Sequence, residues 1–420
     1  MMTKEEISRA SVEWEDFCIA LRRDFHRHPE LSGQEVRTIA RICEELRQAG
    51  LSPIEVENGG VLAVVEGNAP GKTVLLRADV DALPVQEDPC NLLKEKNCVS
   101  QVPGVGHVCG HDCHAAMLVT AGKILAKHRD FPGRIILMFE RGEEGGGNIR
   151  YLIDYLQKNQ WNIDGIWGLH LNNEIPTGKF AIRSGPLMAG GLMFDITLVG
   201  KDGHGSRPDW SNNPVDCFHT IQTALDKIRM RMVDPSSALT FSICKVVTES
   251  QRPNIIGRTL NFAGNVRFFD LEHAYRPFSK AMRRMIDHIA AAFECQVLYN
   301  QFDCIAVPLV NNQDCYHIAE RALTEQFGPE RVIPGPLKFG SESFSYLMNF
   351  WPGMYLNLGV YDPALGTGAG HHTAKFDVDE SQLKTGVAVH IAYAQAFLNN
   401  PNEITGFTSY PGTIWDLLNE

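Results

Sequence analysis

The stretch Cys109-Gly110-His111-Asp112-Cys113-His114 joins a polar loop to an apolar helix. It places thiol, imidazole and carboxylate groups within six positions. Glycine has no Cβ to restrict φ, so Gly110 lets the flanking side chains converge. From 113 to about 128 apolar residues recur at helical spacing, which predicts a helix with one buried face.

Short apolar runs of the buried-strand type lie on both sides of this helix. They span 61–65, 74–78, 135–139 and 166–169. Two further helices are predicted before them, at 12–26 and 35–49, and three elements after Pro308, namely helix 313–326, strand 354–359 and helix 380–398. Strands that alternate with helices predict an α/β domain with a mostly parallel sheet.

The middle of the chain has a different pattern. We predict strand 192–199, helix 214–232, strand 239–247, strand 259–268, helix 271–293 and strand 296–303. The order βαββαβ is typical of a ferredoxin-like domain. We therefore predict a discontinuous catalytic domain, 1–190 and 306–420, with a ferredoxin-like domain inserted at 191–305.

Composition narrows the range of partners. The chain has 420 residues, and its 39 basic and 50 acidic residues give a net charge of −11. This charge argues against nucleic acid or an anionic membrane as a partner. No apolar run approaches the ~20 residues that span a bilayer. The 11 scattered cysteines and the charged N-terminus lead us to expect reduced thiols and a cytoplasmic protein.

Polar side chains follow the predicted strands at the points where the strands end. In chain order they are Asp79 and Asp81, Glu143 and Glu144, His170, and His371 and His372. The carboxyl ends of parallel strands share one edge of a sheet, and binding sites form there. We therefore expect residues that are far apart in the sequence to meet at this edge.

The candidate metal ligands combine a soft thiolate with imidazoles and a carboxylate. They are Cys109, His111, Glu144, His170 and His372. This mixture suits Zn²⁺ or another first-row divalent ion such as Mn²⁺, Co²⁺ or Ni²⁺. Five ligands exceed one tetrahedral set with an open position. We therefore expect one or two ions, with the Cys109 thiolate or a water shared between two.

Further polar residues have supporting roles in this hypothesis. Asp79, Asp81 and Asp112, together with His114, are placed to hold the ligand imidazoles. Glu143 stands beside Glu144, so one carboxylate can bind metal while its neighbour acts as general base on a water. Cys90 and Cys98 lie in the polar loop 86–106 and are either a secondary metal or redox pair or plain loop thiols.

In these motifs the chain resembles the aminoacylase–hippurate hydrolase group of dinuclear metallopeptidases, which includes indole-acetyl-amino-acid hydrolases. The resemblance runs nearly end to end and is carried by six motifs. They are Arg22-Arg23-Asp24-Phe25-His26-Arg27-His28-Pro29-Glu30-Leu31, Arg77-Ala78-Asp79-Val80-Asp81-Ala82-Leu83-Pro84, Gly106-His107-Val108-Cys109-Gly110-His111-Asp112-Cys113-His114, Glu143-Glu144, Gly168-Leu169-His170 and His372-Thr373-Ala374-Lys375-Phe376-Asp377.

The resemblance implies a role for each residue that matches a family motif. It implies the same five metal ligands, with His372 rather than His371, and Glu143 as general base. It implies that the inserted domain is a lid and dimerisation domain, so a homodimer or higher homo-oligomer is expected. His204 would stabilise the oxyanion in a neighbouring active site, and Asn254 and Arg267 would hold the carboxylate of the substrate.

Several residues depart from the family pattern near the expected pocket. Gln-Pro-Ala is usual where Glu140-Arg141-Gly142 stands, Asp is usual at Ser343, proline is usual at Ala374, and the loop 86–106 is unusual. These departures leave the metal chemistry intact and put the substrate in question.

We expect hydrolysis of a C–N bond in a small carboxylate-bearing substrate, foremost the amide of an N-acyl amino acid. One alternative is a hydrolytic deaminase of an activated aromatic amine such as a nitro-aminobenzoate. Another is a non-catalytic metal-binding scaffold.

Overall fold

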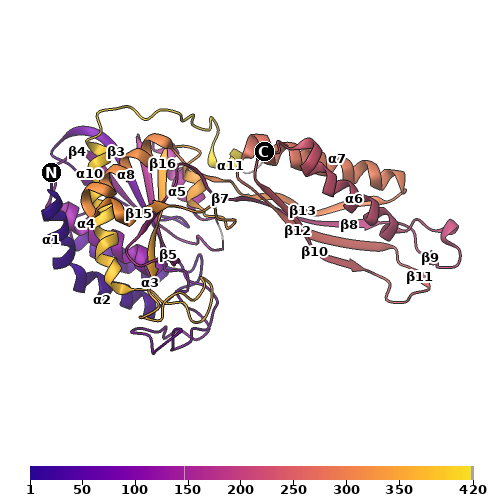
Figure 1. Cartoon of the computed structure of the whole chain (residues 1–420), viewed down its shortest axis with the longest axis horizontal. Coiled ribbons are helices and arrows are strands. Elements are labelled where there is room, and N and C mark those ends of the chain that lie inside the picture. Colours follow the sequence, from indigo (N-terminus) through magenta and orange to yellow (C-terminus); the bar gives the residue numbers. More distant parts are fainter. Residues whose placement is uncertain (146, 418–420) are drawn as a thin grey trace. The chain divides into compact units, whose positions relative to one another are not determined.

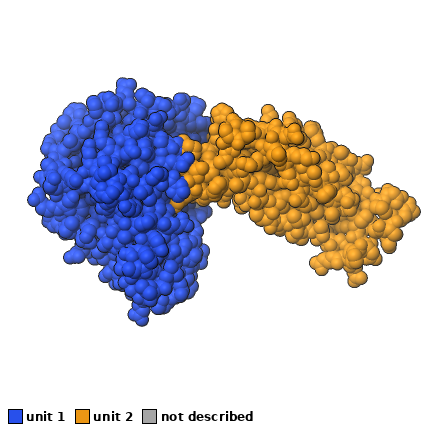
Figure 2. Space-filling view, viewed as in Figure 1, with its two compact units in different colours: residues 1–185, 311–336, 346–420 blue, residues 186–310, 337–345 orange. Residues whose placement is uncertain are grey.

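The computed structural model describes residues 1–145 and 147–417 and divides the chain into two compact units (Figure 2). Unit 1 comprises 1–185, 311–336 and 346–420, and unit 2 comprises 186–310 and 337–345. The boundaries predicted from the sequence are 190/191 and 305/306. Residues 337–345, which that prediction gives to the catalytic domain, group with unit 2. Gly146, which follows the paired glutamates, lies outside the described residues.

The core of unit 1 is an eight-stranded sheet with the order β1-β2-β4-β3-β5-β16-β6-β15. Figure 1 labels β3, β4, β5, β15 and β16 of this sheet. Its central strands β4, β3, β5 and β16 are all parallel, which confirms the mostly parallel sheet. The bounds are β1 Ile54–Val56, β2 Gly60–Glu66, β3 Ala69–Asp79, β4 Pro132–Glu140, β5 Gly165–Pro176, β6 Phe180–Ile182, β15 Val332–Pro334 and β16 Gly353–Tyr361. Almost every residue of β16 is buried, because helices cover a parallel sheet on both faces.

Helices α4 and α10 lie against each other and against β3. The helices of unit 1 are α1 Lys4–Glu13, α2 Glu15–Arg27, α3 Val36–Gln48, α4 His111–Lys127, α5 Ile149–Lys158, α8 Gln313–Phe327, α10 Leu383–Leu398 and α11 Ile414–Leu417, while α9 Phe344–Leu347 spans the unit boundary. Where α4 meets α10, a Cβ added at Gly386 would lie 2.0 Å from Met117 Sδ. The two helices therefore approach each other closely, and a side chain at position 386 would have to displace Met117.

The N-terminal helical region differs from its prediction. The predicted helix 12–26 corresponds to α2, and α1, which precedes it and meets it at Trp14, was not predicted. Thr3 closes the start of α1 through a capping box with Glu6. Outside this region, helix α5, which follows the paired glutamates, was not predicted either.

Unit 2 is a four-stranded antiparallel sheet with helices α6 and α7 on one face (Figure 1). Its elements are β8 Gly190–Val199, α6 Pro214–Met232, β10 Leu239–Thr248, β12 Thr259–Phe268, α7 Arg276–Ala292 and β13 Gln296–Ala306. The order β10-β12-β8-β13 confirms the ferredoxin-like domain. Residues along β12 alternate between buried and half-buried, so one face of the sheet forms the core under the helices.

Two short strand pairs complete unit 2 and its connection. Strand β9 (Gly203–His204) pairs with β11 (Ile255–Ile256), and β7 (Gly185–Met188) pairs with β14 (Leu309–Asn311). In the part of the chain that the structure describes, no helix is both long and apolar enough to cross a membrane. The eleven cysteines are all free thiols there.

Candidate metal centre

The carboxyl ends of the central strands bring the predicted ligands together in unit 1. Asp79 is the last residue of β3, and Glu143 and Glu144 follow the end of β4. His170 lies inside β5 rather than at its end, because this strand continues to Pro176. His111 is the first residue of α4, and Gly110 precedes it with a φ of 96°, a left-handed conformation that suits glycine.

The side chains of all five predicted ligands fall into three overlapping groups, in each of which the ligand atoms lie within 4.8 Å of one another. The groups are Cys109 with Glu144 and His372, His111 with Glu143 and Glu144, and Asp79 with His111, His114 and His170. The Cys109 thiol also lies 3.6 Å from His170 Nε2, which connects the first group with the third. The donor set is thus one thiol, imidazoles and carboxylates, which suits a first-row divalent ion.

His111 is oriented so that one ring nitrogen remains for a metal. Its Nδ1 lies 3.0 Å from Asp81 Oδ1, while its Nε2 is buried and has no hydrogen-bond partner. Asp81 also accepts hydrogen bonds from the Ser32 hydroxyl (2.6 Å) and the Glu144 N–H (3.0 Å). Burial would raise the pKa of Asp81, but these bonds and His111 lower it, so the carboxylate stays charged.

His170 and Cys109 also fit a metal site. His170 Nδ1 donates a hydrogen bond to the Leu171 carbonyl (2.6 Å), which leaves Nε2 facing the thiol of Cys109. Burial lowers the pKa of His170, so the ring is neutral, the form that binds metal. Burial raises the pKa of the Cys109 thiol, so a nearby cation is needed to hold the thiolate there.

His114 supports the site and does not present a free nitrogen to it. Its Nδ1 donates to Asp79 Oδ1 (2.6 Å), and its Nε2 accepts the Leu171 N–H (2.9 Å). Asp79 is held in turn by Arg77, whose Nη1 lies 2.7 Å from Asp79 Oδ2. Arg77 also contacts Glu140 at 2.5 and 2.6 Å, so two buried carboxylates surround this guanidinium. The sequence did not reveal that Arg77 and Glu140 hold Asp79, and through it His114, in place.

Asp112 does not hold a ligand imidazole, contrary to our prediction. Its Oδ2 lies 2.7 Å from Arg22 Nε and 2.8 Å from His26 Nδ1. The reason is helical geometry, because adjacent residues of a helix point about 100° apart whereas residues three positions apart share a face. His114 therefore lies on the side of His111, and Asp112 points into the interior behind it.

His372 has an unusual backbone conformation. Its φ is +63°, in the left-handed region that non-glycine residues rarely adopt. Its N–H donates to the Val108 carbonyl (2.9 Å), and its Nε2 lies 2.9 Å from Glu144 Oε1. The ring of His371 instead packs on His170 and belongs to none of the three groups, so His372 rather than His371 is the candidate ligand of this segment.

The turn that carries the paired glutamates is braced by a residue that sequence analysis missed. Glu35 is fully buried, and its Oε1 accepts the N–H groups of Gly33 and Gly142, each at 2.8 Å. Its Oε2 accepts a hydrogen bond from Arg141 Nε (2.9 Å). Burial raises the pKa of Glu35. Arg141, one of the departures from the family pattern, thus helps to support the turn before Glu143.

The three remaining site candidates lie in unit 2. His204 and Asn254 are close together, because Gly205 N–H donates to the Asn254 carbonyl (2.9 Å) and β9 pairs with β11. Arg267 lies near the other end of β12, where Nη1 donates to the Ser341 hydroxyl (2.7 Å). The strand from Thr259 to Arg267 spans about 26 Å at its usual rise. One chain therefore does not present both Asn254 and Arg267 to the same small molecule.

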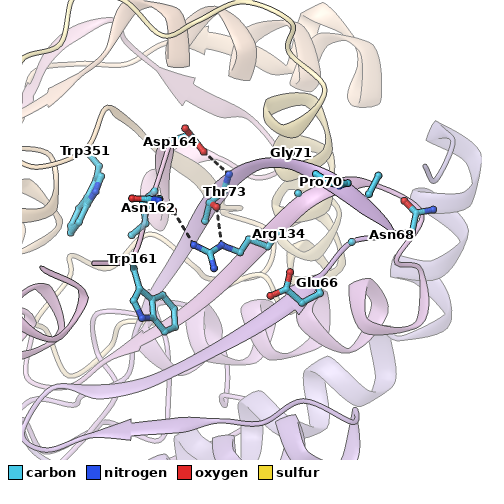
Figure 3. A pocket seen from close by; sticks show the side chains of 14 residues that line it. Glu66, Asn68, Pro70, Gly71, Thr73, Arg134, Trp161, Asn162, Asp164 and Trp351 are labelled. Atoms are coloured by element: carbon cyan, nitrogen blue, oxygen red, sulfur yellow. Dashed lines mark hydrogen bonds between the residues drawn. The ribbon is translucent and has the colours of Figure 1, made fainter. Parts of the chain in front are cut away.

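A pocket with a volume of about 970 Å³ lies at the amino ends of β3, β4 and β5 (Figure 3). Arg134 braces this region by donating to Thr73 Oγ1 (2.9 Å) and to the Asn162 carbonyl (3.2 Å). None of the candidate ligands lines this pocket, since they all gather at the opposite, carboxyl ends of the strands. Cys90 and Cys98 belong to no metal-ligand group among the described residues either.

This arrangement, a thiol, imidazoles and two adjacent carboxylates at the carboxyl edge of a parallel sheet, defines a metal-binding hydrolase. The sequence model of peptidase family M20/M25/M40 matches residues 75–396, and the chain belongs to this family.

Two relatives and one solved structure support the assignment. The chain is 34% identical over 405 residues to thermostable carboxypeptidase 2 of Saccharolobus solfataricus, covering 94% of this chain and 99% of that protein. It is 35% identical over 315 residues to an N-acyl-L-amino acid amidohydrolase of Geobacillus stearothermophilus, covering 74% and 82%. A dinuclear metal-binding M20 peptidase from Bacillus subtilis matches with a TM-score of 0.76 and 26% identity over 92% of this chain and 99% of that one. The resemblance and the hydrolytic class are thereby confirmed.

Proposed function

We propose that the protein is a metal-dependent amidohydrolase that cleaves the amide between an acyl group and an amino acid with a free carboxylate. The observation that carries the proposal is the group of Glu143, Glu144 and His111, which offers two adjacent carboxylates beside one ligand imidazole. One relative is named a carboxypeptidase and another an N-acyl-amino-acid amidohydrolase. Substrates of both kinds contain an amide nitrogen that belongs to an amino acid.

Five residues would hold the metal, namely Cys109, His111, Glu144, His170 and His372. We propose two divalent ions of the first transition row, Mn²⁺ or Zn²⁺ foremost and Co²⁺ or Ni²⁺ as substitutes. Such an ion polarises a carbonyl oxygen and lowers the pKa of a water towards ~7. The eleven free thiols support a reducing compartment, which we take to be the cytoplasm.

Glu143 is the general acid–base in this proposal. Its carboxylate would accept a proton from the attacking water and later give it to the nitrogen of the leaving amino acid, while Glu144 would be one of the residues that hold the metal. Such a group contributes about 10²–10⁴-fold to the rate. Asp81 supports this division of roles, because it holds both the His111 ring and the Glu144 backbone.

His204 would donate to the developing oxyanion, and Arg267 would pair with the carboxylate of the substrate through its planar fork. The distance along β12 separates Arg267 from His204 and Asn254 within one chain. We therefore propose a homodimer in which His204 and Asn254 serve the active site of the partner. The relatives do not support either the aromatic-amine deaminase or the non-catalytic scaffold.

The test is the substitution Glu143→Gln, assayed for amino-acid release from a panel of N-acyl amino acids and dipeptides in the presence of Mn²⁺. We expect metal content to be unchanged and kcat to fall about 10²–10⁴-fold, because the proton acceptor is lost. Glu66→Gln, at an exposed glutamate near the pocket of Figure 3, serves as a control and should keep full activity.

Nearly full turnover by Glu143→Gln would contradict the general-base role. Turnover that survives complete removal of metal by a chelator would contradict the proposed chemistry altogether. Ammonia release from ortho-aminobenzoates, with N-acyl amino acids inert, would change the reaction from amide hydrolysis to deamination.

A further inference from the structure

The loop 86–106 packs against the segment that carries His372. The N–H of Asp88 donates to the carbonyl of Ala374 (3.0 Å), two residues beyond this ligand. Other hydrogen bonds join the same two segments: Asn91 Nδ2 to Asp377 Oδ2 (2.8 Å) and Leu92 N–H to the Gly366 carbonyl (3.1 Å). The unusual loop of this chain is therefore part of the support of the metal centre.

Lys96 is the buried cation in this contact. Its side chain is 1% exposed, and Nζ donates to Glu87 Oε1 at 2.9 Å. The same Nζ donates to the Ala374 carbonyl, also at 2.9 Å. A buried ammonium is held in place by such partners, because each unmade bond would leave a desolvated polar group. Lys96 thus binds the His372 segment to Glu87.

Glu87 continues the connection towards the helix that carries His111. Its Oε1 lies 2.9 Å from His26 Nε2, and the other nitrogen of His26 lies 2.8 Å from Asp112 Oδ2. Asp112 is in the first turn of α4, one residue after His111. A continuous series of charged contacts therefore runs from Asp112, the neighbour of His111, through His26, Glu87 and Lys96. It ends at the Ala374 carbonyl in the segment that carries His372.

The backbone at His372 requires this kind of support. Its left-handed φ of +63° is unfavourable for a residue with a Cβ, so neighbouring contacts must hold it. On one side its own N–H donates to Val108, the neighbour of Cys109. On the other side the Ala374 carbonyl accepts hydrogen bonds from Lys96 and from Asp88.

We propose that Lys96 is a positioning residue for the metal ligand His372. By fixing the Ala374 carbonyl against Glu87, it holds the His372 imidazole beside Glu144. This inference rests on the metal centre of the proposed function and adds to it a residue that touches neither metal nor substrate. Substitution of a residue that orients a metal ligand in this way typically lowers the metal affinity by about 10–100-fold.

The test compares Lys96→Met with Lys94→Met, which removes an exposed lysine from the same loop. Mn²⁺ binding to the whole 420-residue chain is measured by titration calorimetry and by metal content after gel filtration. We expect Lys96→Met to lower the affinity for one Mn²⁺ ion by about tenfold or more. We expect Lys94→Met to bind Mn²⁺ as tightly as the wild type does. Unchanged binding by Lys96→Met would overturn the positioning role.

A double-mutant cycle with His372→Ala shows whether Lys96 acts through this ligand. We expect Lys96→Met to cause no further loss of Mn²⁺ affinity once His372 is absent. Losses that multiply would overturn the proposal, because Lys96 would then act on another part of the site. If wild type binds no Mn²⁺, the proposed metal centre fails and the positioning role fails with it.

Two features guard against a folding defect in Lys96→Met: the partners that Glu87 keeps, and a second variant that removes both charges. Without Lys96, Glu87 keeps His26 and the Ser100 N–H (2.6 Å) as partners. Should Lys96→Met fail to fold, the double variant Lys96→Met/Glu87→Gln removes both charges and leaves no unpaired ion in the interior. The same loss of Mn²⁺ affinity is expected, and wild-type affinity in the folded double variant would overturn the proposal.

Discussion

At the scale of single residues, Glu87 keeps its charge in the interior because three donors surround it. They are His26 Nε2, Lys96 Nζ and the Ser100 N–H. Burial would raise the pKa of Glu87, but His26 and Lys96 outweigh it and lower the pKa to about 2. Because the folded pKa lies below the unfolded value, the stabilisation is complete above pH 4.5 and is lost as the pH falls towards 2.

Glu87→Gln should therefore destabilise the protein at pH 7 by up to about 3 kcal/mol, and by much less at pH 3. Urea unfolding of both proteins, followed by circular dichroism at each pH, measures the difference. The subtraction of wild type from variant removes the contribution of other carboxylates that titrate in this range. An equal difference at both pH values would show that the charge of Glu87 is not what stabilises the network.

At the scale of secondary-structure elements, the crossing of α4 and α10 depends on Gly386. A Cβ there would lie 2.0 Å from Met117 Sδ, so Gly386→Ala must displace this side chain or separate the helices. Such overpacking costs about 1–3 kcal/mol. We expect the cost to shrink when Met117→Ala opens space at the same crossing. Thermal unfolding of the four proteins of this cycle tests the coupling, and a cost independent of Met117 would contradict it.

The same scale shows how much of the structure could be predicted. Apolar runs were enough for β3, β4, β5 and β16, since a parallel sheet buries both faces of its strands. The order of unit 2 followed from its alternation of strands and helices. Helix α5 was missed although its apolar residues recur at helical spacing; they are Ile149, Leu152, Ile153 and Leu156.

Other parts of the site carry no local signal. Glu35 and Glu140 are buried acids whose partners, Arg141 and Arg77, are distant in sequence, and a buried glutamate has the same sequence pattern as an exposed one. Motif positions predicted which residue types meet at the sheet edge. They did not predict that Asp112 would turn away, because this depends on the position around α4 at which the helix begins.

At the scale of the whole molecule, the residues of the proposed catalytic site come from two units that have separate cores. The five candidate ligands and Glu143 belong to unit 1, whereas His204 belongs to unit 2. His204 is exposed, and its Nδ1 accepts the Ser206 N–H (3.1 Å). This hydrogen bond leaves the other ring nitrogen as the one that would donate to an oxyanion.

If His204 serves the partner subunit, two inactive variants should restore activity to each other. After subunit exchange between equal amounts of His204→Ala and Glu143→Gln, about half of the dimers are mixed. Each mixed dimer has one site in which an intact Glu143 meets an intact His204 from the other chain, so about a quarter of wild-type activity is expected. A histidine that served its own chain would leave the mixture as inactive as its components, because each chain would still lack one of the two groups.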